Sequence, residues 1–259
     1  MKYCRRLLMD GAENARDLGG YATADGGVTR YGVFLRSALP ENLSTVDVDL
    51  LRNYHVIRSV DLRSEQEASA EPSNLAGVDE IEYINIPLFN SAAASASASE
   101  RKKEWKKSPV GFVLPDWNVH YIDMLEQHKD RVRELMEAMA GNGCIHFNCF
   151  TGKDRTGLCA AMLLSIAGVS AEDICADYSL SMAYLGRRYE TIKVKYGVKL
   201  DGDGYPDLGS GFCATLPSYM RRTLGYLDEQ YGGVLQYLKH CGVGETLISG
   251  IREKFVEYD

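Results

Sequence analysis

The strongest constraint on the fold is a junction between two apolar segments. Residues 144–148 read CIHFN and have the length and composition of a buried strand. Residues from about 155 to 167 are apolar nearly all round a helix, so that helix has to be covered on every side. The loop between them, CFTGKDR (149–155), carries a thiol and three charged side chains. A buried strand does not tolerate this mixture, so the chain has to turn here.

Strand-like and helix-like segments are intermixed along the rest of the chain. Apolar segments bounded by turn residues predict strands, and apolar residues at helical spacing predict helices. The expected strands cover residues 33–35, 55–63, 81–89 and 144–148. The first expected helix begins near Ser44. Further helices are expected at residues 119–139, about 155–167, 171–189, 217–230, 232–240 and 244–257. This order, with helices dominating the second half, predicts one α/β domain over residues 1–259.

The composition is that of an ordinary globular protein. The 259 residues are 45% hydrophobic and 25% charged, which is enough to build a substantial core. The net charge of −7 argues against a general nucleic-acid-binding protein, which is normally basic. It also means that an anionic substrate has to be attracted by a local basic site rather than by the field of the whole protein.

The cysteines and the apolar runs bear on metal binding and location. Seven cysteines are scattered without a C-x-x-C pair, at positions 4, 144, 149, 159, 175, 213 and 241. Such a set favours free thiols in a reducing compartment, and the five histidines do not supply zinc-ligand spacing, so we expect no metal and no cofactor. No segment has the apolar run of a signal peptide or the roughly 18 apolar residues of a membrane span. The default expectation is a cytoplasmic protein without integral membrane association, and export through a removed or non-classical signal is left open.

Residues 91–109 break the pattern of alternating elements. They form a tract of serine and alanine followed by five basic residues around Trp105. Long irregular segments inside compact domains are often insertions or lids. Two interpretations follow: a solvated, flexible insertion on the surface, or a lid that contacts an anionic surface.

The loop at 149–155 has the chemistry of an anion-binding site. It contains no proline, so every residue offers a backbone N–H, and a loop wrapped at a helix N-terminus directs such donors at an anion. Arg155 adds a planar guanidinium that can form two hydrogen bonds with an oxyanion. The same donors stabilise a thiolate at Cys149, which makes it a nucleophile for a bound phosphorus. A Walker A loop is excluded, because Asp154 replaces its Ser or Thr and no glycine precedes Gly152 by five positions.

The sequence CFTGKDRTG (149–157) resembles the C-x5-R signature of protein tyrosine phosphatases. More narrowly, it resembles the C-x-x-G-K-D-R-T-G loop of their atypical microbial group, which includes tyrosine and phosphoinositide phosphatases. The resemblance implies a protein-tyrosine-phosphatase-like α/β fold, with a mostly parallel central sheet flanked by helices. Nearly the whole chain apart from residues 91–109 is covered by further pieces of the family pattern: NARDLGGY (14–21), RS (36–37), DLRSEQE (61–67), DYSLS (177–181) and YGGVLQYL (231–238).

The resemblance also implies roles for individual residues. Cys149 is expected to be the nucleophile, Arg155 the group that holds the transition state, and Asp154 the general acid within the loop itself. The acid must be protonated to donate to the leaving oxygen and then ionised to activate water. The residues expected to contact the substrate are Phe150, Thr151, Gly152, Lys153, Thr156 and Asp61.

Two other aspartates compete with Asp154 for the role of acid. Asp116 lies 33 residues before the loop cysteine, a separation similar to that in small dual-specificity phosphatases. Its alternative is a place in the first turn of a helix capped by Asn118. Asp61 ends an expected buried strand, and ligand sites of open α/β sheets lie at such ends. The alternative for Asp61 is a pair with Arg63 or a backbone turn.

Lys153 and Thr156 each allow two interpretations. Lys153 holds a second anionic group or is simply solvated. Thr156 donates its hydroxyl to the leaving thiolate or caps the helix that follows. Arg16 and Asp17, in contrast, are expected to be structural, as an ion pair that locks a turn.

The residue before the cysteine departs from the family pattern. The family usually has histidine there, whereas this chain has Asn148, with His146 two positions earlier on the same side of the strand. An asparagine donates hydrogen bonds but carries no charge. Activation of the thiol is therefore expected to depend more on the loop amides.

These residues predict an enzyme that hydrolyses phosphate monoesters through a phosphocysteine intermediate, with phosphotyrosine on proteins as the first expected substrate. A phosphoinositide phosphatase with the same chemistry is the alternative favoured by Lys153 and the basic residues at 101–107. The third hypothesis is a catalytically silent phospho-binding module, against which the intact Cys149, Asp154 and Arg155 argue. The expected partners are a phosphorylated protein or a phosphoinositide, not a nucleic acid. The oligomeric state is not predicted.

Overall fold

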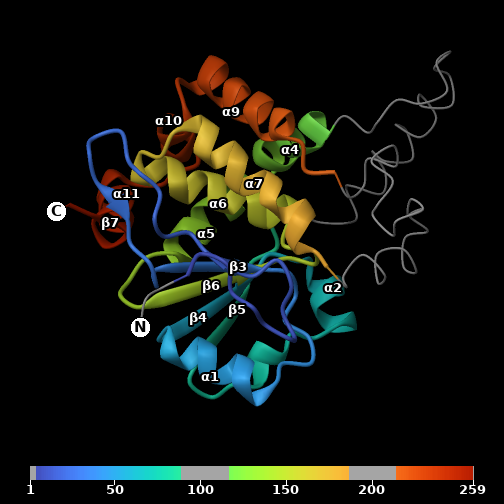
Figure 1. Ribbon diagram of the computed structural model, residues 1–259. Coiled ribbons are helices and arrows are strands. Elements are labelled where there is room, and N and C mark those ends of the chain that lie inside the picture. The colour runs from blue at the N-terminus through green and yellow to red at the C-terminus, as the bar shows by residue number, and fades with distance from the viewer. Residues whose placement is uncertain (1–3, 89–116, 187–213, 259) are drawn as a thin grey trace, which may run out of the picture.

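The computed structural model describes residues 4–88, 117–186 and 214–258. Its centre is a five-stranded sheet with the strand order β1-β3-β6-β4-β5 (Figure 1). The four strands from β3 to β5 are parallel, and the edge strand β1 is antiparallel to β3. The expectation of a mostly parallel sheet is therefore confirmed. The strands are β1 (Arg16–Asp17), β3 (Phe34–Ser37), β6 (Cys144–Asn148), β4 (Val56–Asp61) and β5 (Glu82–Asn85).

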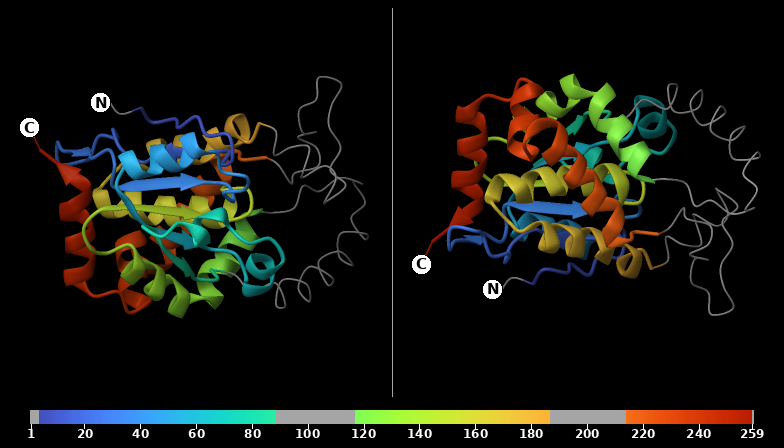
Figure 2. Two further views of the ribbon diagram at one scale, coloured as in Figure 1. Left: turned by 90° about the horizontal axis from the view of Figure 1, so that it is seen from below. Right: turned by 90° about the horizontal axis from the view of Figure 1, so that it is seen from above.

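Helices cover both faces of the sheet, so the fold has three layers (Figures 1 and 2). On one face, α1 (Thr45–Asn53) and the short 3-10 helix η1 (Asn74–Gly77) bury Leu51 and Leu75 against Leu35 of the sheet. Ser44 caps α1, as expected from the sequence, and forms a reciprocal capping box with the third helical residue. The layer on the other face is larger. Its helices are α4 (Trp117–Gln127), α5 (Lys129–Ala138), α6 (Asp154–Ala167), α7 (Ala171–Tyr184), α9 (Pro217–Tyr231), α10 (Val234–His240) and α11 (Glu245–Phe255).

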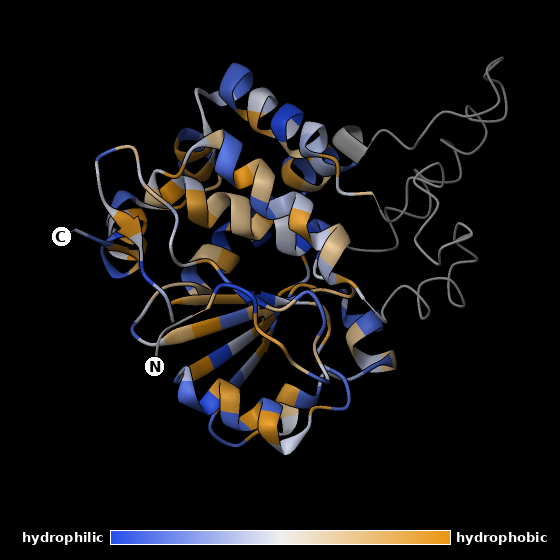
Figure 3. Ribbon diagram, in the orientation of Figure 1, coloured by the Kyte–Doolittle hydropathy of each residue, from blue (hydrophilic) through white to orange (hydrophobic). Residues whose placement is uncertain are grey.

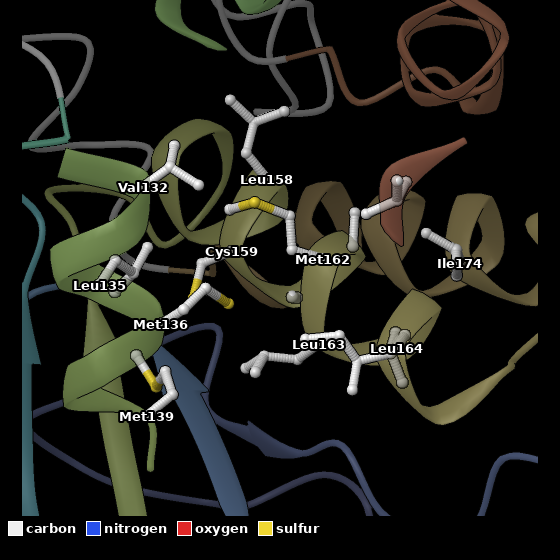
Figure 4. Close-up of a cluster of buried hydrophobic side chains, with 14 of the residues drawn as sticks. Val132, Leu135, Met136, Met139, Leu158, Cys159, Met162, Leu163, Leu164 and Ile174 are labelled. Carbon is white, nitrogen blue, oxygen red and sulfur yellow. The ribbon is translucent and has the colours of Figure 1, made fainter. Parts of the chain in front are cut away.

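The helix α6 lies at the centre of the larger layer, which explains its apolar sequence. Every residue from 156 to 164 is buried, and Gly168 ends the helix in the left-handed conformation with a φ of 85°. Figure 4 shows Met136 of α5, and Met139 directly after it, on the side of Cys159 and Leu163 of α6. Polar residues instead dominate the outer helix α9, at the top of Figure 3. The core therefore reaches to the first turn of α6, directly behind the loop at 149–155.

The central strand β6 is buried along its whole length, as strands covered on both faces are. Its one imidazole, His146, lies between two hydroxyl groups of the neighbouring strands. Its Nε2 is 2.8 Å from Oγ of Ser37, and its Nδ1 is 2.9 Å from Oγ of Ser59. Burial lowers the pKa of His146 to about 4, so a neutral imidazole joins the three strands at neutral pH.

The helices predicted at 119–139 and 171–189 differ from the structure. The segment 119–139 was expected to form one helix, but it forms two, because His128 has the non-helical angles φ −129° and ψ 38°. No proline or glycine marks the break, so side-chain spacing alone predicts an unbroken helix. The break lets α4 pack against α9 while α5 stays with α10. The helix expected at 171–189 ends at Tyr184, and residues 187–189 lie outside the described part of the chain.

The C-terminal segment returns to the N-terminal third of the chain. The helix expected at 244–257 ends at Phe255, whose ring packs edge-on against Phe34 with ring centroids 4.9 Å apart. The residues that follow form β7 (Val256–Glu257), which pairs antiparallel with β2 (Val28–Thr29) in a second, two-stranded sheet. Figures 1 and 2 show these two strands side by side.

Two predicted features, the insertion at 91–109 and Asp116, lie outside the described residues. Within the described parts of the chain, every helix is too short or too polar to cross a lipid bilayer.

Candidate active site

The loop at 149–155 lies where the parallel strands β3, β6 and β4 end. Cys149 follows the last residue of β6, and Asp154 is the first residue of α6. The carboxyl edge of parallel strands is where open α/β sheets place their ligand sites. The loop side chains are nevertheless well packed: Cys149 is 2% exposed, and Phe150 and Thr151 are also buried. The thiol thus lies at the bottom of the loop rather than on the surface.

Gly152 allows the loop to curl against the neighbouring strand. Its φ is +65°, a conformation that other residues rarely adopt. A Cβ atom here would also overlap the backbone carbonyl of Ser37 at the end of β3. Two independent constraints therefore require glycine at this position.

The loop carbonyls are held on its outer side. The amide Nδ2 of Asn14 donates to the carbonyl oxygens of Thr151 (3.0 Å) and Gly152 (2.9 Å), and Nη2 of Arg36 also donates to Gly152 (2.8 Å). The described peptide bonds are all trans, so the N–H of the next residue points away from each of these carbonyls. The amides of Gly152 and Lys153 consequently point to the inner side of the loop, which is the orientation that an anion cradle requires.

A buried cluster of three charges lies behind these carbonyl contacts. The carboxylate of Asp177 on α7 accepts from Nε of Arg16 (2.8 Å) and from Nη1 of Arg36 (2.6 Å). All three side chains are at most 1% exposed. Burial alone would raise the pKa of Asp177, but the two guanidinium groups lower it to about 2. Burial and the charge of Arg16 lower the pKa of Arg36 to about 10, so Arg36 stays charged at neutral pH. The cluster therefore carries a net charge of +1.

The expected ion pair between Arg16 and Asp17 is wrong, although both residues are structural. Neighbouring strand residues point to opposite faces of a sheet, so the two side chains cannot meet. Arg16 instead pairs with Asp177. Asp17 accepts hydrogen bonds from the backbone N–H groups of Gly19 (2.8 Å) and Gly32 (2.7 Å), and it holds two turns.

Arg155 forms a bidentate ion pair with Glu67 of α2 (Glu65–Ala70). The distances are 2.6 Å from Nη1 to Oε2 and 3.0 Å from Nη2 to Oε1. Glu67 is itself fixed, because it also accepts from the backbone N–H of Ser64 in a capping box. Burial opposes its ionisation, but Arg155 and this cap lower the pKa of Glu67 to about 2. Glu67 was missed as a site residue, although the spacing of Ser64 and Glu67 in the sequence is that of a capping box.

Asp154 is held by residues from two sides. The hydroxyl of Tyr121 on α4 donates a short hydrogen bond to its Oδ1. Nζ of Lys153 lies 3.2 Å from the same oxygen, and the Lys153 side chain is 2% exposed. The structure therefore places this ammonium against Asp154 and away from bulk solvent. Tyr121 was also missed, because no sequence signal links a helical tyrosine to an aspartate 33 positions later.

Asp61 lies beside the loop, but its carboxylate is engaged elsewhere. It is paired with Asn148 of the neighbouring strand β6 and is fully buried. Its Oδ2 accepts from Nη2 of Arg63 (2.7 Å) and from the hydroxyl of Tyr83 (2.9 Å). The alternative that Asp61 pairs with Arg63 is thus confirmed.

Two buried polar atoms near Cys149 have no hydrogen-bond partner among the described residues. These are Oγ1 of Thr156 and Oδ1 of Asn148. The amide Nδ2 of Asn148 donates to the carbonyl oxygen of Cys149 at 3.3 Å. Buried polar groups without partners are costly and are often found at functional positions. In the described chain, no three His, Cys, Asp or Glu side chains are placed to bind a metal ion.

The charge cluster leads to a stability prediction for Asp177→Asn. This change leaves two buried guanidinium groups without their shared carboxylate, so the free energy of unfolding at pH 7 should fall by about 3–5 kcal/mol. Urea denaturation measures it. The pKa of Asp177 is about 2 in the folded protein and about 4 in an unfolded chain. The stability that ionised Asp177 contributes is therefore complete above pH 4 and is lost as the pH falls towards 2.

The control is Glu257→Gln, which removes a carboxylate 3.6 Å from Arg30 at the surface, where both side chains are more than 40% exposed. Its effect should stay below about 1 kcal/mol. Equal stability of Asp177→Asn and the wild type at pH 7 would show that the cluster does not support the fold.

Comparison with known proteins places this site in a family. A model of the tyrosine phosphatase family matches residues 7–257. The tyrosine-protein phosphatase of Nostoc commune is 29% identical over 226 residues, which are 85% of this chain and 72% of the relative. The triple specificity protein phosphatase PtpB of Mycobacterium tuberculosis is 23% identical over 270 residues, covering 94% of this chain and 96% of the relative. The crystal structure of TpbA from P. aeruginosa matches with a TM-score of 0.33 and 15% identity, over 86% of this chain and 97% of that one.

The family match covers every part of the site described above. It includes the segment with Arg16, the helix with Glu67, the loop with Cys149 and the helix with Asp177. The chain therefore belongs to the tyrosine phosphatase family and is a cysteine-based phosphatase.

Proposed function

We propose that the protein hydrolyses phosphotyrosine on proteins through a phosphocysteine intermediate, with the whole chain acting as one catalytic domain. The observation that carries this proposal is the orientation of the loop at 149–155. Asn14 and Arg36 hold its carbonyls outward, and this directs loop N–H groups towards the space that a phosphate would occupy beside Cys149. The site acts on a phosphorylated substrate, as its family indicates.

The proposed reaction has two steps. In the first, the thiolate of Cys149 attacks phosphorus, the S–P bond forms and the bond to the leaving oxygen breaks. Asp154 gives its proton to that oxygen, while the loop amides of Phe150 to Lys153 and the guanidinium of Arg155 hold the phosphoryl oxygens. In the second, Asp154 takes a proton from water that attacks the phosphocysteine. The S–P bond then breaks, and inorganic phosphate and free enzyme are released.

The buried charge cluster lies behind the loop that carries Cys149. The cluster of Arg16, Arg36 and Asp177 has a net charge of +1, and an uncompensated charge in the core is costly. Coulombic attraction to a thiolate at Cys149 favours the cation on Arg36. We propose that the cluster supplies the positive field that the uncharged Asn148 lacks. The hydroxyl of Thr156, buried without a partner among the described residues, then donates to the thiolate when it leaves.

Lys153 bears on the choice of substrate. A phosphoinositide phosphatase needs a cation for a second phosphate of the headgroup. Lys153 is buried with its ammonium 3.2 Å from Asp154, which supports a role within the loop instead. The basic residues at 101–107, the other argument for phosphoinositides, lie outside the described part of the chain. Asp61 is assigned a supporting role, since Arg63 and Tyr83 occupy its carboxylate.

The mechanism predicts that Cys149→Ser abolishes hydrolysis of 4-nitrophenyl phosphate, because a serine hydroxyl is not ionised at neutral pH. The wild-type rate should be unchanged by EDTA. Steady-state kinetics measure the hydrolysis rate of both proteins. Near-ultraviolet circular dichroism verifies that both are folded. Wild-type protein that is folded but inactive would favour the phospho-binding module instead. Parallel release of phosphate from phosphotyrosyl peptides and from phosphoinositide vesicles then decides the substrate, and we expect a higher kcat/KM on the peptides.

The contact with Glu67 gives a second prediction about activity. Glu67→Gln removes the charge that orients Arg155, so kcat/KM for 4-nitrophenyl phosphate should fall about tenfold, the size of one charge-assisted hydrogen bond. The matched control is Glu65→Gln, on the same helix but exposed. It should retain the wild-type kcat/KM. Equal rates for the two variants would show that Glu67 does not prepare Arg155 for catalysis.

A further inference from the structure

Two tyrosines from different helices form a relay of hydroxyl groups that ends at Asp154. Tyr121 on α4 is fully buried, and Tyr178 on α7 is 1% exposed. Their hydroxyl oxygens are 2.6 Å apart, and their rings pack edge to face with centroids 6.1 Å apart. The hydroxyl of Tyr121 contacts Oδ1 of Asp154. Neither tyrosine belongs to the loop, and the roles assigned above to the loop residues do not explain them.

The direction of this relay follows from counting protons. Each tyrosine hydroxyl carries one hydrogen. Because the hydrogen of Tyr121 goes to Asp154, the contact between the two hydroxyls must be donated by Tyr178. Burial and the negative charge of Asp154 raise the pKa of Tyr121 well above its ordinary value, so it remains a donor. The relay therefore runs from Tyr178 to Tyr121 to Asp154.

The relay distinguishes the two carboxylate oxygens of Asp154. Oδ1 receives the hydrogen bond from Tyr121 and lies 3.2 Å from Nζ of Lys153. No side chain or backbone group in the described part of the chain donates to Oδ2. Because Oδ1 already faces two donors, a proton is disfavoured there. A proton added to Asp154 therefore lies on Oδ2.

From this geometry we infer that Tyr121, held by Tyr178, is a positioning residue that makes Oδ2 of Asp154 the acidic oxygen. The inference rests on the proposed function of Asp154 as general acid. When the S–P bond forms and the bond to the leaving oxygen breaks, the proton of Oδ2 moves to that oxygen. Water returns a proton to Oδ2 in the hydrolysis step. Oδ1 keeps its hydrogen bond to Tyr121 throughout, so the carboxyl group does not rotate between the steps.

The other charged groups around Asp154 belong to the loop itself. Lys153 is adjacent in the chain and contacts the same oxygen as Tyr121. Arg155 follows it directly, but the guanidinium is bound to Glu67. Tyr121 reaches Asp154 from a different helix, and its rigid ring is locked by burial. It is thus the contact that sets the orientation independently of the loop.

The test is Tyr121→Phe, assayed on two substrates whose leaving groups differ in their need for a proton. Phenyl phosphate releases a phenolate as basic as tyrosine, with a pKa of about 10, whereas 4-nitrophenolate is a far weaker base. We expect kcat/KM to fall about tenfold for phenyl phosphate, the effect of one hydrogen bond to a charged group, and less than about threefold for 4-nitrophenyl phosphate. The KM for each substrate should change little, because phosphate binding uses the loop amides and Arg155.

The matched control is Tyr231→Phe. Tyr231 also donates to a carboxylate through a 2.6 Å hydrogen bond, to Glu126 in the last turn of the same helix α4. This variant should keep both kcat/KM values. Thermal unfolding of each variant checks the fold. If Tyr121→Phe does not fold, Tyr178→Phe serves instead, because it keeps the ring and hydroxyl of Tyr121. Its kcat/KM should likewise fall more for phenyl phosphate than for 4-nitrophenyl phosphate.

The variant Asp154→Asn separates failure of the inference from failure of the proposed acid. It should lower kcat/KM about a hundredfold for phenyl phosphate and much less for 4-nitrophenyl phosphate. If Asp154→Asn shows this dependence and Tyr121→Phe loses the same factor on both substrates, or nothing, the inference about Tyr121 is overturned and the acid stands. If Asp154→Asn loses equally on both substrates, the assignment of Asp154 as acid is overturned, and the role of Tyr121 with it.

Discussion

The carboxylate of Asp177 lies between two buried guanidinium groups, and the shape of the phosphatase loop depends on this contact. Asp177 fixes Arg36, and Arg36 in turn holds the carbonyl of Gly152. Arg16, the second partner, also contacts the side chain of Asn14, the other residue that holds the loop carbonyls. Loss of the carboxylate would therefore release both supports at once. The cost of burying three charges is offset by a loop whose N–H groups are oriented before any substrate arrives.

A second set of contacts fixes the two charged side chains at the end of the loop. Glu67 aligns Arg155 from α2, and Tyr121 aligns Asp154 from α4. These contacts come from two different helices, so Asp154 and Arg155 are held by different parts of the fold. Geometry that is fixed in advance lowers the reorganisation needed in the transition state. The loop carries the thiol and the charged side chains, and the surrounding helices orient the charged side chains.

The sequence predicts the local parts of this site well and the distant contacts poorly. The strand at 144–148, the buried helix after it and the glycine in the loop all follow from periodicity and turn chemistry, because these signals are local. Arg16 shows the limit: its partner is 161 residues away, and the sequence suggested its neighbour Asp17 instead. Tyr121 and Glu67 were missed for the same reason. Contacts between helices depend on how the layers stack, and the break at His128, which no residue type marks, sets the direction of α4.

The distance in sequence between Asp177 and its partners also bears on the order in which the site forms during synthesis at the ribosome. The loop residues, including Cys149, are synthesised before Asp177, and the contacts of Asp177 with Arg16 and Arg36 span 161 and 141 residues. Contacts of such long range form late in folding, because they close large loops of chain. A nascent chain that has produced the thiol still lacks the carboxylate that orders the cradle. A chain that ends between Cys149 and Asp177 therefore carries the thiol without the ion pairs that support the loop around it.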